Sequence, residues 1–121
     1  MSADHLSVRA HVWLMAGDES LVGPGRIELL EAIADTGSIR QAALRMGMSY
    51  RAAWNAVDAI NRRMNAVMVT RLAGGRRGGG ATLTDDARRL IRTFREIERR
   101  HAGYVEALNN ALGDLLSPGS G

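Results

Sequence analysis

GSIRQAALRMGMSYRAAW, residues 37–54, is the stretch that decides the fold. Ser38 lies where an N-cap belongs, and Gln41 three residues later completes the S-x-x-Q pattern of a capping box, which marks the start of a short helix. Gly47 interrupts the helical pattern, and Ser49 caps the start of a second helix. Two short helices joined by a glycine-containing turn predict a helix-turn-helix.

The residues before this stretch predict a β-hairpin and one helix. Apolar and polar side chains alternate from His5 to Met15, which is typical of a half-buried strand. A turn at 17–19 leads into a short second strand at 20–22. The helix then begins at residues 23–25, where Pro24 is tolerated in the first turn, and ends at 36–37. Its apolar stripe is Ile27, Leu30, Ile33 and Ala34.

The helix that begins at Ser49 and runs to about Asn65 is two-faced. Spacings of three and four residues predict that one face packs on the core, and that face carries Ala53, Val57, Ile60 and Met64. The opposite, polar face carries Arg51, Asn55, Asp58 and Arg62. Tyr50 lies near the N-terminus of this helix, between the two faces.

Two short strands, at 67–72 and 81–83, flank the glycine-rich segment AGGRRGGG at 73–80. This pattern predicts the wing of a winged helix-turn-helix, with Arg76 and Arg77 placed to contact a nucleic-acid backbone. The alternative is a phosphate-binding loop of an enzyme. That motif requires a lysine after its second glycine, and the chain contains no lysine, so the wing is favoured.

The last helix is predicted to begin after Thr84 as N-cap, with Asp85 and Asp86 at its positive end. Apolar and aromatic residues then recur with alternating steps of four and three, which is a heptad seam. We expect this seam to form a homodimer; the alternative is a helix lying across its own domain. The seam residues are Leu90, Phe94, Ile97, His101, Tyr104, Leu108, Ala111 and Leu115.

These patterns together predict a mostly α fold with small β elements. The architecture is a winged helix-turn-helix with an N-terminal hairpin, a two-stranded wing and a long C-terminal dimerisation helix. We expect residues 1–84 to form the winged helix-turn-helix domain, 85–115 the long helix packed on it, and 116–121 a flexible tail.

The positive charge is concentrated in the middle of the chain. The whole chain has a net charge of +3, but residues 37–80 hold eight arginines against Asp58 alone. A localised basic surface is typical of nucleic-acid binding. Arg51 and Asn55 lie one helical turn apart on the polar face, and these residue types pair with guanine and adenine edges respectively. The alternative is an ordinary solvated helix face; we favour contact with double-stranded DNA.

Other function classes find little support in the sequence. The chain has no cysteine, which excludes disulfides and thiolate metal sites. His5, His11 and His101 lie far apart, without the spacing of a metal site, and no catalytic constellation is recognisable. We therefore expect a protein that is not an enzyme and that needs no cofactor. No signal peptide or membrane span is recognisable, which favours the cytoplasm.

Residues 37–61, GSIRQAALRMGMSYRAAWNAVDAIN, followed by the wing GGRRGGGATLT, resemble the N-terminal DNA-binding domain of the ModE family of molybdate-responsive transcriptional regulators. The resemblance runs from about Val12 to about Phe94. It implies a dimeric, sequence-specific regulator of molybdate transport or related genes. It also implies that DNA is contacted by Ser38, Gln41, Ser49, Tyr50, Arg51, Asn55, Arg76 and Arg77; the polar face adds Arg62.

Members of that family continue into small β-barrel domains that bind molybdate or tungstate, whereas this chain ends at Gly121. We therefore expect no molybdate binding from this chain alone. Two alternatives from other classes stay open. One is an architectural DNA-binding protein with little sequence preference, and the other is a small protein that binds an oxyanion or nucleotide at the glycine loop.

Overall fold

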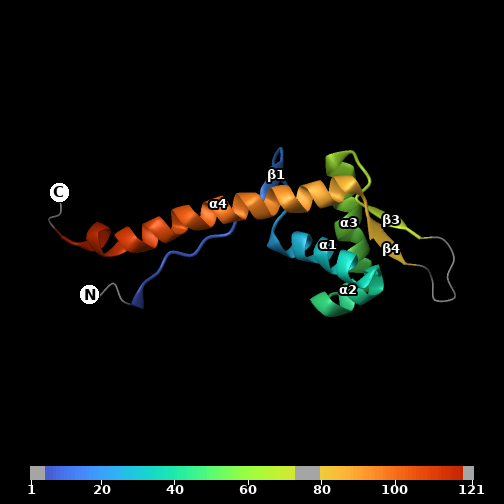
Figure 1. The fold of residues 1–121 in the computed structure, drawn as a ribbon, viewed down its shortest axis with the longest axis horizontal. Helices are drawn as coiled ribbons and strands as arrows, with labels where there is room; N and C mark the ends of the chain where they lie inside the picture. Colours follow the sequence, from blue (N-terminus) through green and yellow to red (C-terminus); the bar gives the residue numbers. More distant parts are fainter. Residues whose placement is uncertain (1–4, 73–79, 119–121) are drawn as a thin grey trace.

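The computed structural model describes residues 5–72 and 80–118 and shows four helices and two small two-stranded sheets in those residues (Figure 1). In chain order the elements are β1 (Leu14–Ala16), β2 (Glu19–Val22), α1 (Pro24–Thr36), α2 (Ile39–Met46), α3 (Tyr50–Met64), β3 (Val69–Arg71), β4 (Ala81–Leu83) and α4 (Asp85–Leu116). The predicted class, a mostly α winged helix-turn-helix with a long C-terminal helix, is confirmed.

The N-terminal hairpin is shorter than the alternation of side chains predicts. β1 pairs antiparallel with β2, whereas residues 6–13 form no strand and run beside α4 (Figure 1). There the backbone N–H of Val8 donates to Asn109 Oδ1 over 2.7 Å, and Asn109 Nδ2 donates to the Val8 carbonyl over 3.1 Å. The prediction of a strand over His5–Met15 is therefore wrong for most of its length, because a helix side chain takes the place of a pairing strand.

Two arginines fix the hairpin to the helices behind it. Arg26 of α1 donates to the carbonyls of Ser20 and Leu21 over 3.1 and 2.8 Å. Arg63 of α3 donates to the same Ser20 carbonyl and to Glu19 Oε2, both over 2.8 Å. Burial, followed by the nearby positive charge of Arg63, lowers the pKa of Arg26. Arg63 is therefore a structural arginine, although it lies in the basic segment of the sequence.

Left-handed residues end the three helices of the helix-turn-helix. Gly37 after α1, Gly47 after α2 and Asn65 after α3 have φ angles of 69°, 68° and 52°. Glycine adopts this conformation without the Cβ clash that other residues suffer, and asparagine tolerates it better than most. These sharp helix ends set the directions in which α2 and α3 leave their turns.

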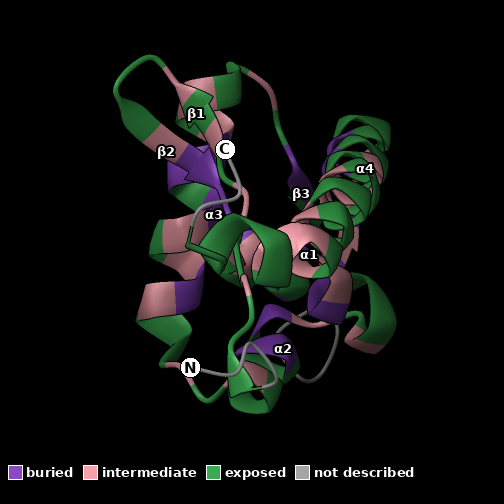
Figure 2. Cartoon of the chain, turned by 90° about the vertical axis from the view of Figure 1, so that its left-hand side faces the viewer, coloured by how far each residue is buried: buried purple, intermediate pink, exposed green. Residues whose placement is uncertain are grey.

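The core is built from buried residues of α1, α2, α3, β2, the two wing strands and the first turns of α4; Figure 2 colours the buried residues purple. Ile27, Leu30 and Ile33 of α1 are buried as predicted, but Ala34 is exposed. The reason is that α1 packs against neighbours on several sides, so its buried face is displaced to include Leu29 and Ala32.

On α3, Ala53, Val57 and Ile60 are buried as predicted, whereas Met64 is 37% exposed. Met64 lies in the last turn of the helix, where the core ends. Ala59 is buried in addition to the predicted residues. The polar face of α3 is unaffected by these differences, because the register of the helix is the one that the spacing predicts.

α4 begins as predicted and then leaves the body of the protein. The Thr84 hydroxyl accepts from Ala87 N over 3.2 Å and donates to the Val67 carbonyl over 2.7 Å, so the cap also ties α4 to the chain before β3. Its buried residues end at Phe94, and the helix continues to Leu116 (Figure 1). Residues 119–121 of the predicted tail lie outside the described residues.

Candidate nucleic-acid interface

The polar face of α3 is exposed along its whole length. Arg51, Asn55, Asp58 and Arg62 are all exposed, and they lie opposite the buried residues of the same helix. A hollow of about 450 Å³ is lined by Asn55, Asp58, Asn61 and Arg62. The structure thus brings together the residues predicted to contact base edges and leaves them open to a partner.

Ser38 and Ser49 are engaged in capping. Ser38 Oγ accepts from Gln41 N over 3.1 Å, and Ser49 Oγ accepts from Ala52 N over 3.0 Å. The predicted capping box is only half formed, because the backbone N–H of Ser38 donates to Thr36 Oγ1 over 3.3 Å. The Gln41 residue is exposed at the start of α2. The contacts that the resemblance implies for these residues stay predictions.

An arginine–aromatic cluster lies at the N-terminal end of α3. We use this name for Arg40 of α2, Tyr50 and Trp54 of α3, and Arg71 of β3. The guanidinium carbon of Arg71 lies 4.1 Å from the centre of the Trp54 ring, and that of Arg40 lies 4.6 Å from the centre of the Tyr50 ring. Arg71 also donates to the Tyr50 hydroxyl over 3.4 Å, and the two rings meet edge to face.

Sequence reasoning missed Arg40 and Arg71 as members of the site. The only signal was their place in the basic segment, next to the turn and in the wing strand. Trp54 is half-buried and packs against the core. One face of its ring system is nevertheless open to Arg71.

The wing is anchored to the turn between α1 and α2. The backbone N–H of Ala81 donates to the Gly37 carbonyl over 2.8 Å, and β4 pairs with β3 from Val69 to Arg71. A Cβ on Gly80 would lie 2.9 Å from that same carbonyl oxygen, so the strand crosses the turn at a distance that only glycine allows. The predicted contacts Arg76 and Arg77 lie outside the described residues.

Arginines differ in how their charge is balanced. Those on the remaining surface of the body and on α4 mostly have a carboxylate partner: Arg45, Arg63, Arg88, Arg89, Arg95, Arg99 and Arg100. Within residues 5–72 and 80–118, no carboxylate lies within ion-pair distance of Arg40, Arg51, Arg62 or Arg71. The positive charge is therefore left uncompensated around α3, which favours a polyanionic partner there.

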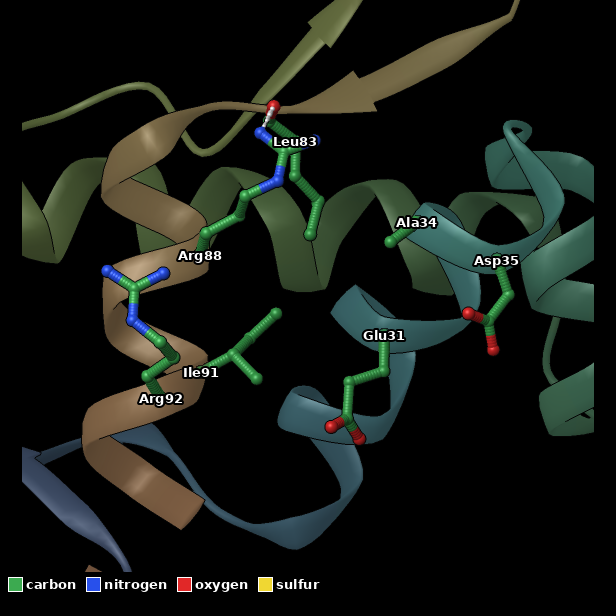
Figure 3. Close-up of a pocket in the computed structure, with 7 residues that line it drawn as sticks. All are labelled: Glu31, Ala34, Asp35, Leu83, Arg88, Ile91 and Arg92. Atoms are coloured by element: carbon green, nitrogen blue, oxygen red, sulfur yellow. Dashed lines mark hydrogen bonds between the residues drawn. The ribbon is translucent and has the colours of Figure 1, made fainter. Parts of the chain in front are cut away.

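A second hollow, of about 440 Å³, lies between α1 and α4 and includes no residue of α3 (Figure 3). Three of its four charged side chains, those of Glu31, Asp35 and Arg88, are bound within the chain. Arg88 donates to the Leu83 carbonyl over 2.8 Å, and Glu31 accepts hydrogen bonds from Arg95. The bonds from Arg95 to Glu31 and Glu98 raise the pKa of Arg95. This hollow is therefore a gap between two packed helices, α1 and α4, and we assign no ligand to it.

The predicted dimerisation residues fall into two groups. Leu90 and Phe94 are buried in the core of the same chain. Ile97, Tyr104 and Leu115 are exposed, and His101 and Leu108 are half-buried. The part of α4 that is accessible to a second copy therefore begins at Ile97. The role of these residues in dimerisation stays a prediction.

Metal-binding clusters and membrane-spanning helices are absent from the described part of the chain. No group of three or more histidine, aspartate and glutamate side chains is placed to hold a metal ion there. Among the same residues, no helix combines the length and the apolar character that crossing a membrane requires.

Known proteins that are similar to this chain are helix-turn-helix regulators. The family model of the bacterial regulatory helix-turn-helix protein, lysR family, matches residues 25–88. The molybdenum transport protein ModE of Azotobacter vinelandii is 42% identical over 90 residues, covering 74% of this chain and 33% of the relative. The DNA-binding transcriptional dual regulator ModE of Escherichia coli K12 is 45% identical over 71 residues, covering 59% of this chain and 27% of the relative.

A similar solved structure is the crystal structure of the CbnR_DBD–DNA complex, with a TM-score of 0.57 and 20% identity over 72% of this chain and 94% of that one. At this identity the likeness supports the fold alone. The chain spans about a third of the length of the curated relatives it matches. The resemblance to ModE-type proteins that the motifs indicate is confirmed.

Proposed function

Since the chain belongs to the bacterial regulatory helix-turn-helix proteins of the lysR family, we propose that it is a sequence-specific, DNA-binding transcriptional regulator of the ModE type. The observation that carries the proposal is the exposed polar face of α3, where Arg51, Asn55 and Arg62 lie beside a cluster of uncompensated arginines. Because a regulator of this kind works on the chromosome, the proposal places it in the cytoplasm.

In this proposal α3 enters the major groove of double-stranded DNA. Arg51 donates to the O6 and N7 atoms of a guanine, and Asn55 pairs with the N6 and N7 atoms of an adenine. Tyr50, Ser49 and the start of α2 at Ser38 and Gln41 face the adjoining sugar–phosphate backbone. Arg76 and Arg77 contact the backbone from the wing.

We further propose that two copies bind together through α4. The exposed residues Ile97, Tyr104 and Leu115 would then be covered, and the two α3 helices would read half-sites about one helical turn, or about 34 Å, apart. Half-buried Leu108 lies on the same heptad seam and is expected to take part.

For the regulated genes, we propose those of molybdate transport or related functions. The support is the identity of 42% to relatives described as a molybdenum transport protein and a molybdenum-pterin-binding protein. We propose that residues 1–121 supply the DNA-binding part of such a regulator, and we propose no molybdate site among them.

The experiment is a selection of bound duplexes from a random pool, using the whole chain. We expect an enriched motif of two related half-sites. A pool that stays random although the protein binds it would overturn the proposal and favour an architectural protein. Binding of molybdate, tungstate or ATP in place of DNA, measured by calorimetry, would favour the small-ligand alternative.

The same assay identifies the reading residues. Arg51→Ala and Asn55→Ala should each weaken binding to the selected site by on the order of 1–3 kcal/mol and relax the preference at one base pair. Both residues are exposed, so the free energy of unfolding should stay within about 0.5 kcal/mol of the original. The control is Arg92→Ala, which removes an exposed arginine from α4 and should leave the selected motif unchanged.

A further inference from the structure

The arginine–aromatic cluster joins three elements of the DNA-binding unit through side chains alone. Arg40 comes from the first turn of α2, Tyr50 and Trp54 from the first turns of α3, and Arg71 from the wing strand β3. Both arginines are exposed, and Tyr50 is 38% exposed, so the cluster lies at the surface. Each guanidinium lies over the face of an aromatic ring.

This arrangement leaves most of each guanidinium available to a ligand. A cation over a ring face is held through its flat surface, while its N–H donors lie in the plane of the group and point outward. Arg71 uses one N–H on the Tyr50 hydroxyl over 3.4 Å. Within the described residues neither arginine has a carboxylate at ion-pair distance, so their charge is available too.

The buried part of Trp54 adds an independent observation. Its Nε1 atom is buried and has no hydrogen-bond partner among the described residues. An unsatisfied buried N–H lowers stability, and a leucine would fill such a place without that loss. The ring contributes something that an aliphatic side chain does not, namely the flat surface on which Arg71 rests 4.1 Å from its centre.

We propose that Arg40 and Arg71 form an arginine clamp for the sugar–phosphate backbone of DNA, held in its binding geometry before DNA arrives by the rings of Tyr50 and Trp54. The ligand class is a phosphodiester, and the clamp contributes affinity without reading bases. Arg71 also couples the wing to α3, because a strand residue stacks on the recognition helix. This inference rests on the proposed function, since it assigns new residues to the same interface.

Holding the two arginines in place has a defined energetic effect. A free arginine loses side-chain entropy when it binds a phosphate, and a stacked one has lost much of it already. A lysine at position 71 would keep the charge but would lose the planar fork that can stack and bind at once. Arg71→Lys therefore distinguishes a clamp, which needs the guanidinium, from a simple contribution of positive charge, which lysine also supplies.

The test measures binding of the whole chain to its selected duplex and to a random duplex over a range of salt concentrations. Arg71→Ala should bind both duplexes about tenfold more weakly, as expected for the loss of a charge-assisted hydrogen bond. Its slope of log K against log salt should be shallower by about one phosphate contact. Arg71→Lys should recover only part of the affinity, and Trp54→Leu should weaken binding although both arginines remain.

The matched control is Arg92→Ala, an exposed arginine of α4 outside the cluster. If Arg71→Ala matches this control in affinity and salt slope, or if Arg71→Lys restores full binding, the clamp is contradicted while the proposed function stands. If the unchanged chain binds no duplex, the proposed function itself fails. Circular dichroism checks folding of each variant. Should Arg71→Ala fail to fold, Arg40→Ala carries the same expectation for affinity and slope.

Discussion

At the scale of single residues, left-handed glycines end the helices that lead into α3. The backbone N–H of Gly37 donates to the Ile33 carbonyl, and that of Gly47 donates to the carbonyls of Ala43 and Leu44, so each glycine ends its helix. A side chain at either position has room, since nothing lies within 4 Å of a Cβ, so the constraint is in the backbone itself. The turn between α2 and α3 therefore depends on the left-handed backbone conformation of Gly47 and not on the absence of space for a side chain.

Gly47→Ala should lower the free energy of unfolding by about 1 kcal/mol, because alanine resists the left-handed conformation. Gly25→Ala is the matched control: the same methyl group is added inside α1, also with nothing within 4 Å. There it should be neutral or stabilising by up to about 1 kcal/mol. Chemical denaturation of both variants measures the difference, and equal effects at the two sites would contradict this account.

The sequence predicts correctly which residues are buried and which are exposed where the spacing within a single helix decides it. The spacing of Ala53, Val57 and Ile60 fixes the register of α3, so it also places Arg51 and Asn55 outside. It could not find the partnership of Arg71 with Trp54, because that contact joins residues that are distant in the sequence and meet only after the wing folds back. Met64 was misplaced for a related reason: periodicity does not say where the core ends.

At the scale of elements, the segment before β1 shows how one pattern can have two structural uses. Alternation of apolar and polar residues describes an extended chain, and the segment is extended, but pairing needs a neighbouring strand. In the structure the neighbour is α4, whose Asn109 side chain offers one donor and one acceptor to the backbone of Val8. A side-chain amide thus replaces a strand, and the alternation alone gives no hint of it.

Asn109→Ala should release this segment without unfolding the body. The amide of Val8 should exchange with solvent about tenfold faster or more, since one hydrogen bond of ordinary strength is lost. Amides of the buried core should keep their protection. Asn110→Ala, at an exposed position beside it, is the control and should leave Val8 unchanged. Equal exchange in both variants would mean that Asn109 does not hold the segment.

At the scale of the whole molecule, α4 divides into a part that belongs to the body and a part that extends beyond it (Figure 1). Leu90 and Phe94 close the core, whereas Tyr104 and Leu115 are 64% and 68% exposed. The heptad pattern was read correctly as a continuous helix, but its first apolar positions are used within the chain. Sequence spacing cannot separate these two uses, because a helix presents the same stripe to its own core and to a partner.

Leu108→Asp should weaken the dimer that we propose, because a charge placed in an apolar helical seam loses its hydration when the seam is covered. Light scattering at tens of micromolar should give a dimer for the original chain and a smaller average mass for the variant. Asn110→Asp adds the same charge at an exposed position away from the seam, and this variant should stay dimeric. If the original chain is a monomer, the proposed dimer is contradicted. The proposal that α3 binds DNA is then still decided by the selection experiment.

In the proposed complex the outward face of α3 lies against DNA, and local cleavage of the DNA tests this placement directly. The chain contains no cysteine, so Asp58→Cys gives a single attachment point for an iron chelate on that face. Bound to its selected duplex, the labelled protein should cut a few nucleotides within each half-site, whereas a chelate at Ala107→Cys on α4 should not. A duplex that is bound but left uncut from position 58, or cut equally from both positions, would contradict the claim.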